Sequence, residues 1–291
     1  MQPTDAPWLL IGCGYTGTRL ARRLLAAGAR VVATRRTAEA AARTAADLGP
    51  QADVRLADLQ HAGSVADLVP PGAFVVHTAP PAAPAAAGEE NLVAAAAAAG
   101  ARRLVYVSSS GVYGRGTGDW IDEDALVEPT GPIGERRLEA ETALLTASAR
   151  LGVEAVSLRA AAIYGPRRGS HVSIVAGTHR VPNSAGFVSR IHVDDLGAAI
   201  LSAALAPRLL HRIYNVADNE PTLARRYADE VAAVLGVPPP PTVEPDQSSP
   251  AARELLGADR RVSNRRLLDE LGVQLAYPTW REGLRQAIGE E

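Results

Sequence analysis

The sequence predicts a doubly wound α/β fold, in which a parallel sheet is covered by helices on both faces. Three observations support this prediction. Short apolar segments alternate with helical segments through the first 160 residues. The apolar segments show no alternation of polar residues, as expected for strands buried on both faces. The first of them runs directly into a glycine-rich turn that opens a helix. With 291 residues, the chain is long enough for one large domain, or for a domain of about 200 residues with a smaller lobe.

The elements of the first part follow from these patterns in order. A helix after the glycine-rich turn carries Leu20, Leu24 and Leu25 on one face and ends at Gly28. Six alanines close the third predicted helix and suit close packing against a sheet. The predicted strands are residues 8–11, 30–34, 53–56, 73–78, 104–107 and 155–158, and the predicted helices are 18–27, 38–48, 91–99 and 134–151.

The pattern becomes irregular after Tyr164, with turns at Gly165-Pro166 and Pro182-Asn183. A helix over 193–205, a strand over 213–216 and a helix over 222–235 are expected next. Four prolines at 238–241 predict a stiff connector or an edge segment. Helices over 263–271 and 280–288 then predict a small C-terminal lobe.

Composition excludes several kinds of chemistry. The chain has no lysine, so all 30 of its Lys+Arg residues are arginine. Schiff-base catalysis and a phosphate loop that ends in Gly-Lys-Ser/Thr are therefore impossible, and arginine cannot replace lysine as a base because its pKa lies above about 12.

Charge and apolar content indicate the kind of partner. A formal charge of -2 and a pI near 6.3 give no basic surface for nucleic acid, and no apolar stretch approaches the roughly 20 residues of a membrane span. We therefore expect a small-molecule substrate, no nucleic-acid or membrane partner and no metal site. The only cysteine, Cys13, cannot form an internal disulfide, which fits a cytoplasmic protein.

The glycine-rich turn predicts a dinucleotide site. Gly12, Gly14 and Gly17 form a G-x-G-x-x-G between the first strand and the first helix, with Tyr15 and Thr16 inside it. Such glycines allow a tight turn, close approach of a pyrophosphate and close packing of the helix, whose N-terminus attracts anions. We predict a Rossmann-type dinucleotide-binding domain over residues 1–160. Residues 161–291 are predicted to mix returning Rossmann elements with the small substrate lobe.

The end of the second strand indicates which dinucleotide binds. NAD-binding proteins place an Asp or Glu there to hold the ribose 2′-hydroxyl, but this chain has Thr34-Arg35-Arg36. Guanidinium groups bind a 2′-phosphate through paired hydrogen bonds, so NADP(H) is predicted over NAD(H). Alternatively, Arg35 and Arg36 form a solvated face.

Further cofactor contacts are predicted at the ends of the next strands. Asp58, with Leu59, ends the third strand, where its carboxylate reaches the adenine edge or caps a helix. Thr78 and Ala79 end the fourth strand on the cofactor side. His77, just before them, is an attractive base, but a single histidine at a strand end is more often structural.

Several segments, taken together, resemble the extended short-chain dehydrogenase/reductases, the NAD(P)-dependent epimerases and dehydratases. They occur in the family's order over nearly the whole chain. They are the glycine turn, the serine-rich strand at 104–114, Leu158-Arg159 with Ile163-Tyr164-Gly165-Pro166, the segment 190–196 and Tyr214-Asn215-Val216-Ala217-Asp218.

The resemblance implies a catalytic Tyr four residues before a Lys, with a Ser or Thr in the preceding strand. Ser109 matches the hydroxyl position, but Ile133 occupies the position of the Tyr and Arg137 that of the Lys. Ile133 cannot transfer a proton, whereas Arg137 can still bind ribose hydroxyls. This combination is similar to atypical members of the family, which keep the glycine turn and the segment 189–195 but often lack the catalytic residues.

Without the usual Tyr, an enzyme needs another proton donor. Tyr113 is the best candidate by position, and the alternative is that its ring only forms part of the pocket wall. His192 is expected to be structural, at the start of a helix that Asp194 or Asp195 caps. Four arginines are candidates for binding an anionic substrate: Arg159, Arg167, Arg168 and Arg190.

Three hypotheses for function remain open. The first is an NADP(H)-dependent oxidoreductase or epimerase with a non-standard acid. The second is a catalytically silent NADP-binding sensor or scaffold, and the third is a lyase or isomerase that only shares the fold. The family resemblance also makes a homodimer possible.

Overall fold

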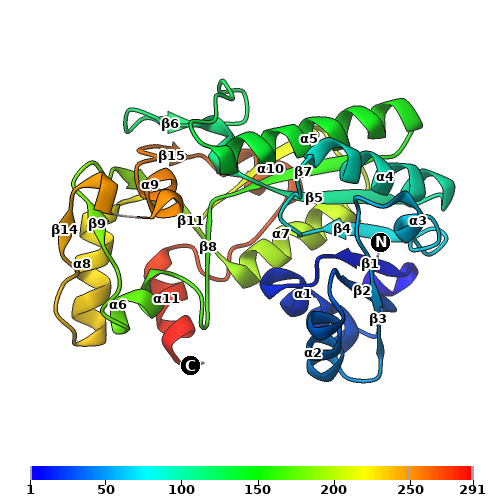
Figure 1. Cartoon of the computed structure of the whole chain (residues 1–291), viewed down its shortest axis with the longest axis horizontal. Coiled ribbons are helices and arrows are strands. Elements are labelled where there is room, and N and C mark those ends of the chain that lie inside the picture. The colour runs from blue at the N-terminus through cyan, green and yellow to red at the C-terminus, as the bar shows by residue number, and fades with distance from the viewer. Residues whose placement is uncertain (1, 248, 290–291) are drawn as a thin grey trace.

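The computed structural model describes residues 2–247 and 249–289, and its largest element is a seven-stranded parallel sheet (Figure 1). The strand order is β12-β7-β5-β4-β1-β2-β3. Because the order reverses between β1 and β4, the sheet is doubly wound, and the predicted fold class is confirmed. The strands are β1 (Trp8–Ile11), β2 (Val31–Arg35), β3 (Ala52–Leu56), β4 (Phe74–His77), β5 (Arg103–Ser109), β7 (Ala155–Ala160) and β12 (Ile213–Val216).

Helices cover both faces of the sheet. One apolar layer packs under α1 (Tyr15–Ala26), α2 (Ala38–Leu48) and α7 (Val193–Leu205), and the other under α3 (Ala62–Val65), α4 (Ala85–Ala98) and α5 (Pro132–Leu151). All residues of β1 and β4 are buried, which explains the absence of a polar alternation in their sequences. No helix in the described ranges is both long enough and apolar enough to cross a membrane.

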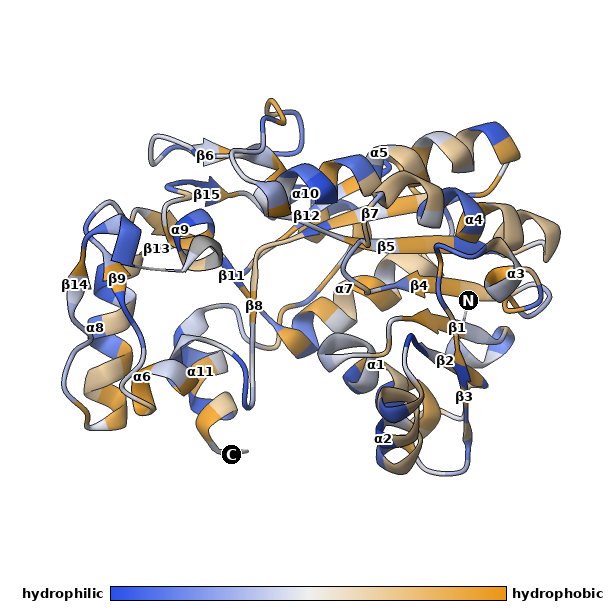
Figure 2. Ribbon diagram, in the orientation of Figure 1, coloured by the Kyte–Doolittle hydropathy of each residue, from blue (hydrophilic) through white to orange (hydrophobic). Residues whose placement is uncertain are grey.

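A smaller lobe follows the central sheet and has its own core (Figure 2). The parallel pair β8 (Ala162–Tyr164) and β11 (Arg190–His192) leads to it from the sheet. In the lobe core, the rings of Tyr227 and Trp280 lie 4.7 Å apart. Its elements are α6 (Ser170–Val175), β9 (Val181–Pro182), β10 (Phe187–Val188), β13 (Thr222–Leu223), α8 (Ala224–Leu235), β14 (Thr242–Val243), α9 (Pro250–Leu256) and α11 (Trp280–Gly289).

The second half of the chain also contributes to the main sheet. Strand β12 pairs with β7, α7 packs on the sheet, and α10 (Arg265–Leu271) adds Leu267 to the same apolar layer. The four prolines at 238–241 form an irregular connector between α8 and β14. β7 ends at Ala160, but the proposed division of the chain into residues 1–160 and 161–291 stays a prediction.

Three helices begin earlier than the sequence predicts: α5 by two residues, at Pro132, and α1 and α4 by three or more. Helix α1 begins at Tyr15, not at residue 18, because Gly14 is already its N-cap. Helix α4 begins at Ala85, not at residue 91. Alanine has the highest helix propensity, so the run of alanines around Gly88 extends the helix back to Pro84 without any side-chain cap.

The predicted cap of α7 was wrong. The N-cap is His192, whose Nδ1 accepts a hydrogen bond from the backbone N–H of Asp194 at 3.3 Å. Asp194 instead pairs with Arg19 at 2.8 Å. The carboxylate of Asp195 accepts hydrogen bonds from the backbone N–H groups of Ala276 and Tyr277 at 2.7 and 3.0 Å. His192 therefore has the structural role expected of it, and Asp195 fixes the segment that precedes α11.

A buried ion pair joins α5 to the sheet. Arg159 of β7 binds Glu141 of α5 with an Nη2–Oε1 distance of 2.6 Å, and both side chains are at most 4% exposed. The Ser157 hydroxyl donates to the same carboxylate at 2.7 Å. Arg159 was expected as a candidate for binding an anionic substrate, but its guanidinium is already occupied inside the protein.

We predict that Glu141→Ala lowers the free energy of unfolding by about 3–5 kcal/mol, because it leaves the Arg159 guanidinium buried without a partner. The control is Glu39→Ala, which breaks the exposed Arg43–Glu39 pair and is expected to cost at most about 0.5 kcal/mol. Urea unfolding followed by circular dichroism measures both. Equal losses in the two variants would contradict the structural role of the buried pair.

Candidate functional site

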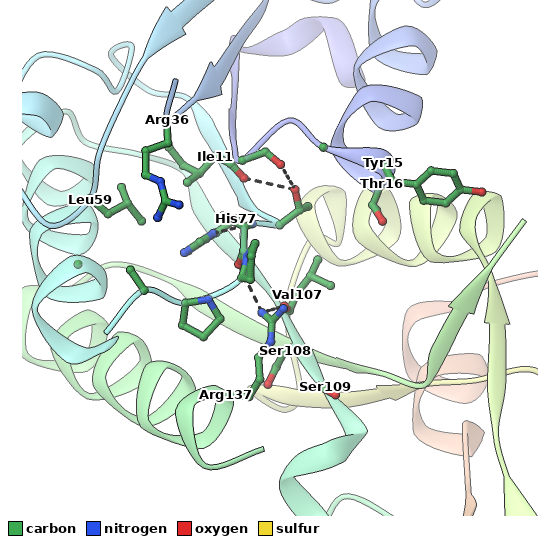
Figure 3. Close-up of a pocket in the computed structure, with 18 of the residues that line it drawn as sticks. Ile11, Tyr15, Thr16, Arg36, Leu59, His77, Val107, Ser108, Ser109 and Arg137 are labelled. Atoms are coloured by element: carbon green, nitrogen blue, oxygen red, sulfur yellow. Dashed lines mark hydrogen bonds between the residues drawn. The ribbon is translucent and has the colours of Figure 1, made fainter. Parts of the chain in front are cut away.

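A pocket of about 850 Å³ opens at the carboxyl ends of the central strands (Figure 3). It lies at the reversal of strand order between β1 and β4, where open α/β sheets bind ligands. Its volume falls within the range of about 300–1,000 Å³ that is usual for small-molecule sites. Every predicted cofactor residue lines the pocket except Gly17: Gly12, Gly14, Tyr15, Thr16, Thr34, Arg35, Arg36, Asp58, Leu59, Thr78, Ala79 and Arg137.

The glycine turn packs so closely against the end of β4 that only glycine fits at residue 12. Gly12 has a φ of +73°, and a Cβ placed on it would lie 2.7 Å from the Cα of Ala79. Gly17 does not line the pocket because it packs α1 against this turn, and its Cβ would lie 3.1 Å from the Thr78 hydroxyl. Gly12 and Gly17 therefore allow close packing, and Gly14 is the N-cap of the helix.

Thr34 fixes the turn from the neighbouring strand. Its hydroxyl accepts a hydrogen bond from the Gly12 N–H at 3.1 Å and donates to the carbonyl of Leu10 at 3.2 Å. Its carbonyl accepts from the N–H of Cys13 at 2.9 Å. Burial also raises the pKa of the Cys13 thiol, which keeps this side chain neutral behind the turn.

The N-terminus of α1 is available to an anion. Its N-cap, Gly14, has no side chain with which to accept from the first N–H groups of the helix. Such groups carry partial positive charge and bind phosphate in many proteins. This turn therefore fits a dinucleotide pyrophosphate.

Arg35 and Arg36 line the pocket at the end of β2. The Arg35 guanidinium donates to the carbonyl of Cys13 at 2.7 Å, while Arg36 is exposed on the same side of the pocket as Leu59 (Figure 3). Within residues 2–247 and 249–289, no carboxylate pairs with either arginine. Two cations without acidic partners therefore border the pocket at the end of β2.

Asp58 lines the pocket but does not cap a helix. Helix α3 has His61 as its N-cap, so the capping alternative was wrong. The Asp58 carboxylate instead holds the preceding turn, because it accepts from the Gln60 N–H at 3.1 Å and contacts His61 Nδ1 at 3.2 Å.

Both ring nitrogens of His77 are occupied by the protein. Nδ1 accepts from the Ala79 N–H at 3.2 Å, and Nε2 lies 3.0 Å from Glu89 Oε2. The two side chains are at most 2% exposed. This arrangement agrees with a structural role and leaves no nitrogen for proton transfer to a ligand.

Two serines end β5 at the opposite end of the pocket. Ser109 Oγ accepts from the Gly111 N–H at 3.0 Å, which leaves its own proton free to be donated. Ser108 Oγ is buried and has no hydrogen-bond partner in the part of the chain that the structure describes. An orphaned polar atom in a pocket wall is the feature that a bound polar ligand would satisfy.

Arg137 is fixed across the ends of two strands. Its Nη1 donates to the carbonyl of Val107 at 3.2 Å and lies 3.4 Å from both the carbonyl of Ala79 and the Tyr106 hydroxyl (Figure 3). Burial raises the pKa of Tyr106 to about 12, so this phenol stays neutral. Ile133, one turn earlier on α5, also lines the pocket and is 43% exposed.

The structure does not bring Tyr113 to the pocket. Its side chain is only 6% exposed, its hydroxyl donates to Asn215 Oδ1 at 2.8 Å, and Arg159 stacks over its ring. Burial raises its pKa. These contacts hold Tyr113 in the core, so we do not retain it as a proton donor.

The pocket also contains residues that sequence reasoning missed, above all Leu255 of α9. Nothing in its local pattern marks it, because it meets the pocket only through the tertiary fold. Arg168, one of the four arginines considered for an anionic substrate, lies at the pocket and stacks over the ring of Tyr15 at 5.2 Å. Arg190 is buried against the Tyr227 ring at 3.5 Å and is not available to a substrate.

No group of three His, Cys, Asp or Glu side chains comes together as metal ligands would in the described ranges.

The comparisons with known proteins agree with this geometry. The model of the NAD dependent epimerase/dehydratase family matches residues 8–217. The chain belongs to this family. This match confirms the predicted resemblance, and the family is one of NAD-dependent epimerases and dehydratases. No curated protein shows a significant match.

Solved structures share the fold of this epimerase/dehydratase family member over nearly its whole length. A functionally unknown conserved protein of Silicibacter pomeroyi is 30% identical, with a TM-score of 0.80 and coverage of 98% of this chain and 99% of that one. The UDP-glucose 4-epimerase of Thermotoga maritima is 18% identical, with a TM-score of 0.81 and 98% of both chains covered. DesIV, a dTDP-glucose 4,6-dehydratase of Streptomyces venezuelae, is 20% identical, with a TM-score of 0.81 over 97% and 96% of the chains. The likeness to these two enzymes shows the fold alone.

We predict that Gly12→Ala weakens binding of a nicotinamide dinucleotide by more than about tenfold and costs about 1–3 kcal/mol of stability, because a Cβ there collides with Ala79 and strains a positive φ. Gly63→Ala is the control, since nothing lies within 4 Å of a Cβ at that position. Fluorescence titration and thermal unfolding measure the two effects. Unchanged binding in Gly12→Ala would show that the turn is not the cofactor site.

Proposed function

We propose that this protein is an NADP(H)-dependent oxidoreductase or epimerase that acts on a small molecule with a non-standard acid/base group. The observation that carries the cofactor preference is the pair Arg35 and Arg36 at the end of β2. A carboxylate at this place repels a 2′-phosphate, whereas these guanidinium groups have no acidic partner in the described chain, and Arg36 is exposed where it could bind one.

The opposite end of the pocket supports chemistry on a substrate oxygen. A nicotinamide cofactor supplies hydride donation or acceptance when bound. Arg137 is held by the carbonyls of Val107 and Ala79, so its charge has a fixed position toward ribose hydroxyls. The free proton of Ser109 is placed to form a hydrogen bond with a substrate carbonyl or alcohol oxygen.

A second candidate function is a catalytically silent NADP-binding sensor. Ile133 favours it, because an alkyl side chain lies where the family's proton donor is expected. The ionisable side chains of the pocket are also engaged by the protein, such as the Tyr15 hydroxyl with the carbonyl of Pro166 at 3.0 Å and His77 with Glu89. Ser109 is the feature that favours the enzyme, since its proton is uncommitted.

We expect NADPH to bind more tightly than NADH, and Arg36→Ala to weaken NADPH binding by about 10- to 100-fold while leaving NADH binding nearly unchanged. The reason is the loss of charge-assisted hydrogen bonds, which contribute about 1.5–3 kcal/mol each. Arg150→Ala, an exposed arginine at the end of α5, is the matched control. Fluorescence titration distinguishes the cofactors, and tighter binding of NADH by the unmodified protein would refute the preference.

We expect Ser109→Ala to lower the rate of hydride transfer by about 100-fold or more without changing NADPH affinity, as removal of a single hydrogen-bond donor to a reacting oxygen does in other enzymes. Ser202→Ala, on α7 and away from this pocket, is the control. The measurement is single-turnover oxidation of NADPH with a panel of aldehydes and ketones. Tight NADPH binding with no turnover on any member of the panel would favour the sensor.

A further inference from the structure

Two large apolar side chains remain accessible at the substrate end of the pocket. Ile133 of α5 is 43% exposed and Leu255 of α9 is 46% exposed, and both line the pocket that holds Ser109. A ligand that covered their accessible surface in this pocket would remove apolar area from water.

Helix α9 is held in this place by a specific contact with α5. Glu254 Oε1 accepts a hydrogen bond from the Gly134 N–H at 2.8 Å. A Cβ on Gly131, the N-cap of α5, would lie 2.5 Å from Glu254 Oε2, so a larger residue there would require this carboxylate to shift. A carboxylate at a helix N-terminus is favourable because it offsets the partial positive charge there. Glu254 thus caps α5 from a distant part of the sequence and positions its neighbour Leu255.

The rest of this wall is also apolar. Five further pocket residues, from β5 and from the segment 160–163, are small or aliphatic: Val107, Ala160, Ala161, Ala162 and Ile163. Of the pocket's charged side chains, Arg168 stacks on Tyr15 beside the glycine turn, and Arg137 is held by backbone carbonyls one turn from Ile133. The substrate end therefore offers the hydroxyls of Ser108 and Ser109 and the fixed charge of Arg137 beside an aliphatic surface.

A nucleotide sugar needs cations and hydrogen-bond donors for its diphosphate, and two of the four arginines considered for such a ligand, Arg159 and Arg190, are not available for it. Arg159 is paired with Glu141 inside the protein. Arg190 is covered by Tyr227 and donates to the carbonyl of Val188 at 2.9 Å. Neither guanidinium is accessible to a ligand in the pocket.

We propose that Ile133, Leu255 and the alanine-rich end of β7 form a subsite for an aliphatic chain, so that the substrate class is small aliphatic aldehydes, ketones or the corresponding alcohols. The proposal rests on the proposed function for the identity of the reacting group. In this subsite, the alkyl side chain of Ile133 binds substrate at the position where the family's proton donor is expected. Glu254 is a positioning residue that holds Leu255 against the same chain.

The test is calorimetric binding of straight-chain alkan-1-ols, from propan-1-ol to octan-1-ol, to the protein saturated with NADPH. Affinity is expected to rise about three- to fourfold for each methylene group until the subsite is filled, as about 0.8 kcal/mol per buried CH₂ requires. Ile133→Ala and Leu255→Ala should each weaken hexan-1-ol binding by about tenfold. Because both side chains are partly exposed, neither substitution removes a core contact. The matched control is Leu210→Ala, whose side chain is 60% exposed and outside the pocket.

Glu254 is tested by a pair of variants. Glu254→Gln retains an oxygen that accepts from Gly134 N–H and should keep hexan-1-ol binding, whereas Glu254→Ala should weaken it. Rescue by the amide separates positioning of α9 from a requirement for charge.

The outcomes decide between the proposals. Alkanol binding without chain-length dependence, no alkanol binding, or binding of UDP-glucose that Ile133→Ala weakens would each overturn the aliphatic subsite. Chain-length-dependent binding that is lost in Ile133→Ala and Leu255→Ala supports it, whether or not hydride transfer occurs. Absence of hydride transfer with the same alcohols and aldehydes would count against the enzymatic function alone, because binding is measured independently of turnover.

Discussion

The close approach of Gly12 to the end of β4 is the constraint on which the pocket depends. The hydroxyl of Thr34, on one neighbouring strand, accepts from the Gly12 N–H, and the hydroxyl of Thr78, on the other, donates to its carbonyl at 2.9 Å. The turn is thereby fixed between β2 and β4. This contact directs the N-terminus of α1 toward the pocket and brings Ala79 close enough for its carbonyl to meet Arg137. A side chain at residue 12 would separate these elements, so one residue links the sheet, the anion-binding helix and the cation of α5.

The fold could be predicted from the sequence because the strands of a buried parallel sheet have a recognisable local pattern of apolar residues. Unbroken apolar strands, the spacing of the glycines and the helix patterns are all short-range, and they place the strand ends at one edge. Most of the predicted cofactor residues line the pocket for the same reason, since they lie at or just after the ends of β1, β2, β3 and β4, whereas Arg137 of α5 was predicted from the family resemblance. Tyr113 shows where this reasoning fails: it also lies near a strand end, but Asn215, about a hundred residues later, binds its hydroxyl in the core. The cap of α7 failed similarly, because the carboxylate of Asp195 is used by a distant loop.

The use of arginine in place of lysine has a structural consequence at Arg137. A guanidinium is planar and carries several donors, so it can bind two backbone carbonyls at the ends of β4 and β5 at once and remain charged. An ammonium would be more mobile there and more easily deprotonated on burial. The charge at this position is therefore rigid. With Ile133 one turn away, the position of the family's catalytic Tyr holds no phenol for this charge to act on, and the two positions no longer act as a pair; the phenol that Arg137 does contact, Tyr106, is buried with a raised pKa.

The other buried arginines have structural roles, in contrast to the arginines that are accessible to a ligand. Arg159 and Arg190 lie near the pocket in sequence, but each is enclosed by groups that neutralise or cover it, Glu141 in one case and Tyr227 in the other. Burying an unpaired charge is costly, so a guanidinium that is paired inside the fold cannot be released to a ligand without that cost. Arg36 has no such partner and is exposed at the pocket. Arg36 is thus accessible at the end of β2, Arg168 lies beside the glycine turn, and Arg137 lies at the end of the pocket that holds Ser109 and the aliphatic wall. Under the proposed function, the arginines at the end of β2 would select the cofactor, and apolar contact would govern what binds beside Ser109.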